Sequence, residues 1–284
     1  MNYKEIYTEE ELAGLQKVET NMLKYLADFC DENEIEYFII GGTALGAVRH
    51  GGFIPWDDDI DVGMTRPNYE KFIKIGKEKI KAPYFMSCRE TEPNTPFPYI
   101  KLRLDNSRYI EYSNRNIKIH QGIYIDIFPY DNAPDDHDTH VEWFTQLQKL
   151  VRLYVLRMTP DYSSKPENLV MHLKAIYSKL RYYLLHLIPA NYIYNKLEKM
   201  MTKYNDQPTK AIETAFVPKA FTSYGTVETF LPPKEIKFGN IIVKGPRDID
   251  TYLTNEYGDY MTFPPEENRY GHKPYVMQLP KDYK

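Results

Sequence analysis

The chain has 284 residues, of which 42% are hydrophobic and 27% charged, as expected for a globular protein with one large domain or a core with an insertion. The net charge of −4 argues against sequence-independent binding of nucleic acid. Two cysteines, Cys30 and Cys88, are too few for a disulfide framework or a cysteine-rich zinc site, and they suit a reducing compartment.

The N-terminal part of the chain predicts a long helix followed by a short buried strand. The first ten residues contain no apolar signal segment, and no apolar run is long enough to span a bilayer, so we expect a cytoplasmic protein. Thr8 can cap a helix with an acidic first turn, and apolar residues at helical spacing extend it to about Asn33. Residues 37–40 form an apolar run that ends at a glycine pair, which is typical of a buried strand, and a short helix is expected over 43–48.

Strands dominate the next part of the chain. Alternation predicts a strand over 59–64, and Pro67 can occupy the first turn of a helix that extends to about Lys81. Because proline cannot donate to a strand ladder, we expect the last strand of this region to end at Pro129. The further strands are expected at 84–88, 99–104, 108–112 and 122–129.

From about Asp136 to Tyr204, strand patterns give way to long helical periodicities that break near three prolines. Beyond this region we expect a hairpin over 236–243, a helix from Pro246 to about Tyr257, and an irregular tail. The fold class that follows is α/β (α+β). Its expected parts are a catalytic core over 1–135, a helical subdomain over 136–205, and a C-terminal hairpin, helix and tail over 206–284 that complete the active site.

A dense run of carboxylates lies between Trp56 and the predicted 59–64 strand. Asp59 and Asp61 share one face of that strand, and Asp57 joins them if the chain is already extended there, whereas Asp58 points away. Like charges this close repel by roughly 2–4 kcal/mol per pair at an effective dielectric constant of about 20, so a divalent cation is expected among them. The alternative, a solvated acidic loop, is disfavoured by the apolar neighbours of the run.

Asp126 lies between aromatic residues on the predicted 122–129 strand. A lone carboxylate in such surroundings is unfavourable unless it is paired or bound to metal. Asp126 is therefore expected to complete the metal site or to accept the proton of an attacking hydroxyl group. The alternative is a structural aspartate that binds a nearby backbone group or arginine.

The glycine pair and several cations suggest a phosphate site. Residues 41–43 lie between a strand and a helix, where backbone N–H groups and the positive end of the helix point at an anion. Arg49 and His50 can add charge to that pocket, and a solvated surface position is the alternative for both. Lys101 and Arg103 share one face of the 99–104 strand and suit a diphosphate, with a salt-bridged edge strand as the alternative.

The segment from Gly41 to Asp61 closely resembles the signature of the LicD family of phosphocholine transferases, whose wider group includes fukutin and fukutin-related protein. The resemblance continues over residues 122–131 and resumes near the C-terminal end, at Arg269 and His272 among others, while the helical middle matches only loosely. It implies a nucleotidyltransferase-like mixed sheet flanked by helices. The glycine pair, the Asp59/Asp61 pair and Asp126 would then occupy the positions of the superfamily's glycine pair, Asp-x-Asp motif and third carboxylate.

The resemblance also implies an activity, namely Mg²⁺-dependent transfer of phosphocholine from CDP-choline to a hydroxyl of a cell-surface glycan, with release of CMP. The glycan would be of the teichoic acid, capsule or lipopolysaccharide type. One or two Mg²⁺ ions, with Mn²⁺ as the alternative, would be held by Asp57, Asp59, Asp61 and Asp126, and the catalytic residues would be Asp59, Asp61 and Asp126. The residues expected to bind the donor are Gly42, Thr43, Arg49, Lys101, Arg103, Arg269 and His272.

Three alternatives stay open at this point. The donor can be CDP-ribitol, CDP-glycerol or CDP-ethanolamine instead. The chain can also be a catalytically inactive module that binds nucleotide or glycan, which the intact carboxylate set disfavours. Finally, the helical middle can rest on a membrane that carries a lipid-linked acceptor, at the inner face of that membrane, with a packed helical subdomain as the competing interpretation.

Overall fold

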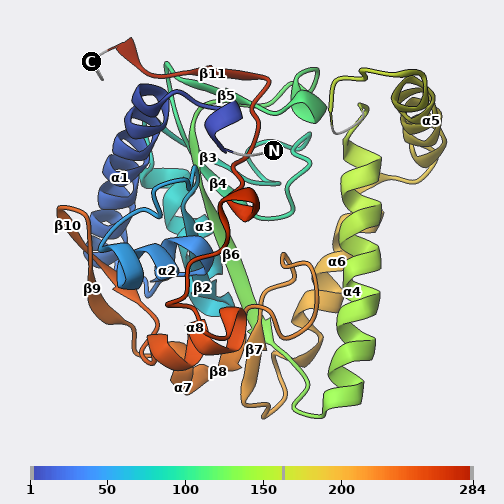
Figure 1. Ribbon diagram of the computed structural model, residues 1–284. Coiled ribbons are helices and arrows are strands. Elements are labelled where there is room, and N and C mark those ends of the chain that lie inside the picture. The colour runs from blue at the N-terminus through green and yellow to red at the C-terminus, as the bar shows by residue number, and fades with distance from the viewer. Residues whose placement is uncertain (1–2, 162–163, 282–284) are drawn as a thin grey trace.

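The protein is described by a computed structural model that covers residues 3–161 and 164–281 (Figure 1). Within these residues one mixed sheet has the strand order β1-β2-β6-β4-β3, and β7 and β8 extend it beside the far end of β6. β2 and β6 run parallel, and the other pairs are antiparallel. The strands are β1 (Phe38–Ile39), β2 (Asp61–Thr65), β3 (Tyr84–Ser87), β4 (Ile100–Leu104), β6 (Tyr124–Asn132), β7 (Ala211–Glu213) and β8 (Tyr224–Thr226). The predicted α/β fold class is confirmed.

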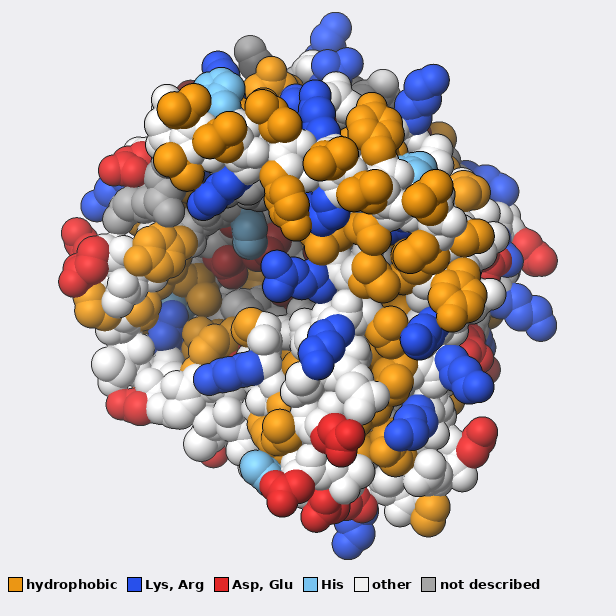
Figure 2. All heavy atoms as spheres, turned by 90° about the vertical axis from the view of Figure 1, so that its right-hand side faces the viewer, with side chains coloured by type: hydrophobic (Ala, Val, Ile, Leu, Met, Phe, Trp, Pro, Cys, Tyr) orange, Lys and Arg blue, Asp and Glu red, His pale blue; other side chains and the backbone are white. Residues whose placement is uncertain are grey.

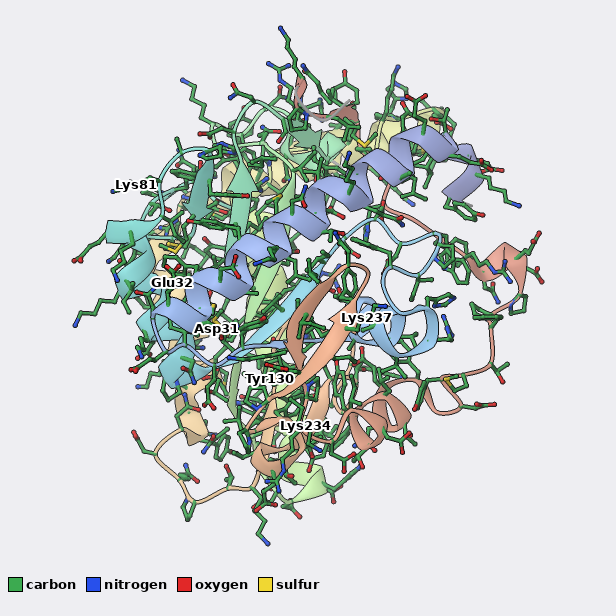
Figure 3. The ribbon with its side chains drawn as sticks, turned by 90° about the vertical axis from the view of Figure 1, so that its left-hand side faces the viewer. Asp31, Glu32, Lys81, Tyr130, Lys234 and Lys237 are labelled. Atoms are coloured by element: carbon green, nitrogen blue, oxygen red, sulfur yellow. The ribbon has the colours of Figure 1, made fainter. Side chains whose placement is uncertain are left out.

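The long N-terminal helix α1 (Glu9–Glu32) forms as the sequence predicts. Thr8 and Glu11 make a reciprocal capping box at its start, which satisfies backbone donors that the first turn leaves free. The helix lies along one side of the sheet, next to the hairpin of β9 (Lys234–Phe238) and β10 (Ile241–Gly245) (Figures 1 and 3). Figure 3 labels Asp31 and Glu32 at the end of α1, and Asp31 forms an ion pair with Lys244 of the hairpin.

The β9–β10 hairpin is confirmed, and Gly239 at its turn adopts a φ of +60°, a conformation that glycine reaches without steric strain. Helix α3 (Arg66–Lys79) is also found where Pro67 predicts it. Helix α8 (Ile249–Tyr257) begins three residues after Pro246, because the side chain of Asp248 accepts the backbone N–H of Thr251 and caps it there.

The prediction that the strand containing Asp126 ends at Pro129 is wrong, because β6 continues to Asn132. On one side of β6, β4 pairs with residues only as far as Ile127, and β7 pairs from Asp131 onward. Pro129 lies in the gap between these two partners, where its missing N–H removes no ladder bond on that side. The strand β2 runs along its other side without interruption.

The region after Asp136 is helical, as predicted, and contains α4 (His137–Met158), α5 (Leu169–Leu185) and α6 (Ala190–Met201). α4 and α6 share a buried apolar cluster with β7, separate from the main core around the sheet. α5 stands apart at the outer edge of the molecule (Figure 1). The division into parts 1–135, 136–205 and 206–284 remains a prediction.

The C-terminal region contains more regular structure than the sequence predicts. The strands β7 and β8 and the short helix α7 (Val227–Phe230) fall where no element was expected, because segments of three or four residues leave no readable periodicity. The tail is also not wholly irregular, since β11 (Val276–Gln278) pairs with β5 (Arg108–Ile110). None of the helices in the described parts of the chain is long and apolar enough to cross a membrane.

Candidate active site

The candidate site begins at the junction of β1 and helix α2 (Gly41–His50). The helix starts at the glycine pair itself, two residues earlier than predicted, so both glycines lie in its first turn. A Cβ atom on Gly42 would lie 2.7 Å from Asp57 Oδ2, and one on Gly41 would lie 3.4 Å from Asp61 Oδ2. The carboxylates therefore pack directly against the N-terminal turn of α2, where only glycine leaves them room.

Two of the predicted carboxylates lie side by side on neighbouring strands. Asp61 opens β2, and its register partner on the parallel strand β6 is Asp126. Asp57 and Asp59 precede β2, which begins at Asp61, two residues later than predicted. That Asp59 and Asp61 point to the same side stays a prediction. The burial of Ile60 and Val62 is nevertheless as expected.

The carboxylates of this region interact strongly with one another. Burial, followed by repulsion from neighbouring aspartates, raises the pKa of Asp57 and of Asp61 well above the usual range. Burial also raises the pKa of Asp59, and Asp58 and Asp126 add to that rise. Asp57 Oδ2 is buried and has no hydrogen-bond partner in the described chain. Half-buried carboxylates that repel one another beside an unpaired oxygen are the hard donor set that a divalent cation prefers.

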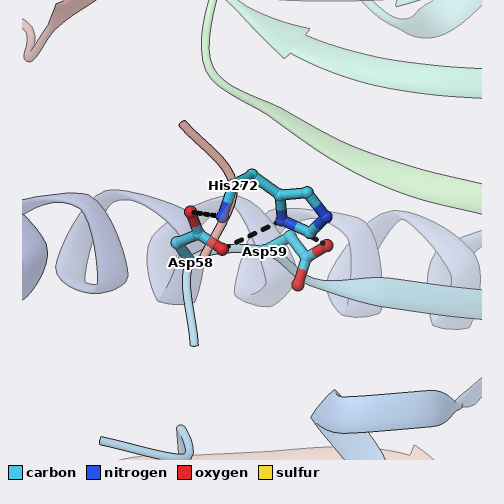
Figure 4. Close-up of side chains that lie close together, drawn as sticks. All are labelled: Asp58, Asp59 and His272. Carbon is cyan, nitrogen blue, oxygen red and sulfur yellow. Dashed lines mark hydrogen bonds and ion pairs between the residues drawn. The ribbon is translucent and has the colours of Figure 1, made fainter. Parts of the chain in front are cut away.

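Asp58 binds the C-terminal tail at His272 (Figure 4). It accepts hydrogen bonds from the Tyr7 hydroxyl at 2.6 Å and the His272 backbone N–H at 2.7 Å, and it pairs with His272 Nδ1 at 3.0 Å. The bond to Asp58 is the main reason that the pKa of His272 rises to about 10, so the imidazole is positively charged at neutral pH. His272 Nδ1 also lies 3.6 Å from Asp59 Oδ2.

Asp58, Asp59 and His272 approach one another closely enough to offer three metal-ligand atoms. The oxygens of Asp58, however, are already engaged by Tyr7 and by His272, and a protonated imidazole has no free lone pair for a metal. No other group of three or more such side chains in the described chain brings its ligand atoms this close together, so a metal site made of Asp57, Asp59, Asp61 and Asp126 stays a prediction.

Lys101 and Arg103 lie on the predicted face of β4, and both are buried. Lys101 Nζ donates to Asp126 Oδ1 at 2.6 Å and to Oδ2 at 2.8 Å, so Asp126 has a lysine partner and not the arginine or backbone group considered above. Arg103 donates to the carbonyl of Gly122 at 3.0 Å. Because β4 lies between β6 and β3, the alternative of a salt-bridged edge strand is wrong.

A cavity of about 560 Å³ opens beside Gly42, with Arg49, Trp56, Tyr257 and Phe263 among its lining residues. The Arg49 guanidinium lies 4.9 Å from the centre of the Phe263 ring and donates to the carbonyl of Tyr260 at 2.9 Å. Arg269 lies in the same way over Trp56, at 4.5 Å. The cavity thus combines aromatic rings with the guanidinium group of Arg49, and Arg269 lies over one of these rings.

Thr43 has a structural contact in addition to its place in the first turn of α2. Its hydroxyl accepts the backbone N–H of Asp61 at 2.9 Å, which fixes the start of β2 against the helix. The predicted residues at 42–43, 49, 57–61, 101–103, 126, 269 and 272 therefore surround one region where α2, β2, β4, β6 and the tail meet.

Sequence reasoning missed Glu19 of α1, which lies close to the acidic segment. Burial and the neighbouring aspartates 57–59 raise its pKa well above the usual range, and its Oε2 has no partner in the described chain. From the preceding turn, Gln16 donates to the carbonyl of Asp57 at 2.8 Å. The sequence feature that could have identified Glu19 is that this carboxylate lies within the apolar stripe that contains Leu15, Val18 and Met22.

Comparison with known proteins gives consistent matches. Residues 34–160 match a family described as LicD/FKTN/FKRP, nucleotidyltransferase domain. The lipopolysaccharide cholinephosphotransferase LicD of Haemophilus influenzae is 28% identical over 272 residues, which cover 93% of this chain and 95% of that protein. The ribitol 5-phosphate transferases FKRP of Homo sapiens and Mus musculus are 42% identical over 41 residues, which cover 14% of this chain and 8% of each relative.

Proposed function

Because this chain is a phosphotransferase with a LicD-family domain, as its sequence predicted, we propose that it transfers phosphocholine from CDP-choline to a hydroxyl of a cell-surface glycan and releases CMP. The observation that carries the proposal is the acidic cluster beside the first turn of α2, where Asp57 and Asp61 lie against the glycine pair and Asp126 is the register partner of Asp61. The long match to the Haemophilus influenzae cholinephosphotransferase supports choline as the alcohol and a lipopolysaccharide-type glycan as the acceptor. We further propose that the reaction takes place in the cytoplasm.

In this proposal Asp57, Asp59, Asp61 and Asp126 hold one or two Mg²⁺ ions. The unpaired oxygen of Asp57 and the raised pKa values of the neighbouring aspartates support this set, because a cation would relieve the repulsion among them. Bound Mg²⁺ would supply charge neutralisation for the diphosphate and for the leaving CMP.

The donor would lie between the acidic cluster and the aromatic cavity. Backbone N–H groups of the first turn of α2 would bind a phosphate, and Arg49 would add positive charge from the same helix. From the tail, Arg269 and the charged His272 would close over the diphosphate. The rings of Trp56 and Tyr257 offer stacking for the cytosine or a cation–π contact for the trimethylammonium group, worth about 0.5–2 kcal/mol per ring.

In this proposal Asp126 acts on the acceptor. The acceptor oxygen would form a bond to the phosphorus that carries choline, the bond from that phosphorus to the CMP oxygen would break, and the hydroxyl proton would pass to Asp126. Lys101 donates to both oxygens of Asp126 and would hold this carboxylate in its orientation. Arg103, two residues further on the same face of β4, would add positive charge beside the diphosphate.

A second candidate donor is CDP-ribitol, supported by the short match to two ribitol 5-phosphate transferases. That match covers only 14% of the chain, so we favour choline. CDP-glycerol and CDP-ethanolamine belong to the same donor test. A module that binds nucleotide without turnover is disfavoured, since it would have no need for four mutually repelling carboxylates.

The test is a donor panel with purified full-length protein, glycan acceptors and Mg²⁺, measured as release of CMP. We expect CDP-choline to be consumed fastest, and Asp61→Asn to reduce the rate by about a thousandfold or more, because the variant weakens the metal site. Tight binding of CDP-alcohols without any CMP release would contradict the transferase proposal. A clear preference for CDP-ribitol would replace choline with the second candidate.

A further inference from the structure

Helix α5 carries a continuous apolar face that points into solvent. Its residues recur every three or four positions and continue one turn past the helix end, and they are 57–84% exposed: Leu169, Leu173, Ile176, Leu180, Tyr183, Leu184 and Leu187. Figure 2 shows hydrophobic side chains gathered over the upper part of the face that carries α5. An apolar patch of this extent on one helix marks an interaction site.

The packing of α5 on the rest of the protein does not use this face. Its single buried residue is Ser178, on the opposite side of the helix. The helix end is held by Arg157 of α4, which donates to the carbonyl of Ile188 at 3.0 Å and contacts His186. The outward face therefore has no part in holding the helix in place.

The charged residues of α5 lie along the borders of its apolar face. No Asp or Glu occurs from Leu169 to Leu197. At 100° per residue, Lys174 and Arg181 follow one edge of the apolar face, and His172 and Lys179 follow the other. Basic side chains along both borders of an apolar stripe are the pattern of a helix that lies in the interface of an anionic membrane.

We propose that α5 docks this protein on the surface of an anionic lipid bilayer, with its apolar face among the acyl chains near the headgroups and its basic borders on the phosphates. A second copy of the chain is a poorer occupant. A two-fold contact through this face would bring the basic borders of one helix near those of the other without any acidic residue in the segment to offset them. Lipid phosphates supply the complementary charge.

The inner side of α5 lies close to the candidate active site. A cavity of about 320 Å³ lies between the helix, the end of α4 and the loop before β4, with Ser178 and Arg181 on one side and Phe97 on the other. The Phe97 ring lies 4.3 Å from Lys101 Nζ, which pairs with Asp126. On the face that carries α5, a hollow has acidic and histidine side chains at its floor (Figure 2). If the proposed function holds, docking would present this hollow to an acceptor attached to a membrane lipid.

Liposome flotation of the full chain tests the docking itself. With vesicles containing about 30% phosphatidylglycerol in phosphatidylcholine we expect the protein to float, and with phosphatidylcholine alone or at about 0.5 M salt we expect much weaker binding. The variant Ile176→Asp/Leu180→Asp should reduce flotation by about tenfold or more, since it places charges in the acyl region, and Lys174→Glu/Lys179→Glu should reduce it on anionic vesicles.

The matched control is Ile242→Asp, which changes an exposed apolar residue on β10 and should float like the unchanged protein. Circular dichroism checks that each variant folds. CMP release from CDP-choline without vesicles should stay within about twofold in the α5 variants, because these residues are outside the site. If the unchanged protein releases no CMP, the proposed function is wrong, but the docking proposal is unaffected.

Absence of flotation in the unchanged protein, or flotation that the α5 variants do not change, would overturn the docking proposal. The same holds if the unchanged protein is a dimer in solution that Ile176→Asp/Leu180→Asp converts to monomer without any binding to vesicles. That result would assign the face to a second copy.

Discussion

At the scale of single residues, the site depends on aspartates that destabilise one another. Asp57, Asp59 and Asp61 each have a raised pKa, in part because of their neighbours. A cation should therefore stabilise the folded protein, and we expect the melting temperature to rise by a few degrees on addition of Mg²⁺ and to fall again with EDTA.

Asp59→Asn/Asp61→Asn should melt at a higher temperature than the unchanged protein in EDTA, since two of the repelling charges are gone, and should gain nothing from Mg²⁺. Differential scanning fluorimetry measures both effects. An Mg²⁺-dependent shift that persists in the double variant would place the ion elsewhere, for instance between Asp58, Asp59 and His272.

Glu256, at the end of α8, predicts a pH dependence of stability. Burial raises its pKa from 4.5 to about 7, and the hydroxyls of Tyr252, Tyr257 and Ser223 oppose that rise. A carboxyl group with a raised pKa in the folded state stabilises the protein fully below its unfolded pKa, and this contribution is lost as the pH rises from about 4.5 to about 7.

Replacing Glu256 with Gln should remove this loss and raise the free energy of unfolding at pH 8 by up to about 3 kcal/mol. Urea unfolding at pH 5 and pH 8 measures the difference, which should be small at pH 5. If Glu256→Gln stabilises the protein equally at pH 5 and pH 8, ionisation of Glu256 is not the cause of the pH dependence.

Local sequence patterns predicted which residues gather at the site. They did not predict the hydrogen bonds that hold these residues in place. The run at 57–61, Asp126, and the cations of β4 were recognisable because charge interrupts apolar strands. The role of Asp58 was not predictable, since its partners Tyr7, Tyr109 and His272 come from three distant segments. No periodicity links such positions.

At the scale of secondary structure, the start of α2 is shaped by its glycines. A methyl group on Gly42 would meet Asp57 Oδ2 at 2.7 Å, so Gly42→Ala must displace that carboxylate. We expect the substitution to destabilise the protein by about 1–3 kcal/mol and to weaken Mg²⁺ binding.

A double-mutant cycle with Asp57→Ala tests this contact, with thermal unfolding as the measurement. In the Asp57→Ala background, Gly42→Ala should destabilise the protein much less, because the clashing oxygen is absent. Equal costs in the two backgrounds would show that the methyl group clashes with something else.

Elements with strong local signals were predicted, and those set by tertiary pairing were not. The capping box and apolar stripe of α1 specify that helix on their own. In contrast, the continuation of β6 past Pro129 depends on where β4 stops and β7 starts, which is a property of the assembled sheet. The strands β7, β8 and β11 each contain three residues and exist only because a partner strand lies beside them.

At the scale of the whole molecule, the C-terminal tail closes the site from outside the sheet. β11 pairs with β5, and His272 docks on Asp58. We expect Asp58→Asn to loosen this docking, so that trypsin cleaves after Arg269 about tenfold faster than in the unchanged protein.

Asp31→Asn is the matched control, since it removes another carboxylate partner of a basic residue, on the surface at the end of α1. Cleavage in the tail should not change in this variant. Tail cleavage that is equally fast in the unchanged protein and in Asp58→Asn would mean that Asp58 does not hold the tail.

Asp58 accepts hydrogen bonds from Tyr7, Tyr109 and His272, which are far apart in the sequence. This site can therefore be completed only late in synthesis. Translation delivers Tyr7 and the aspartates early, and the histidine follows only after more than half of the sequence has been added. A nascent polypeptide can thus assemble its sheet while Asp58 still lacks its last partner. The protein would then become active only after the tail has emerged from the ribosome.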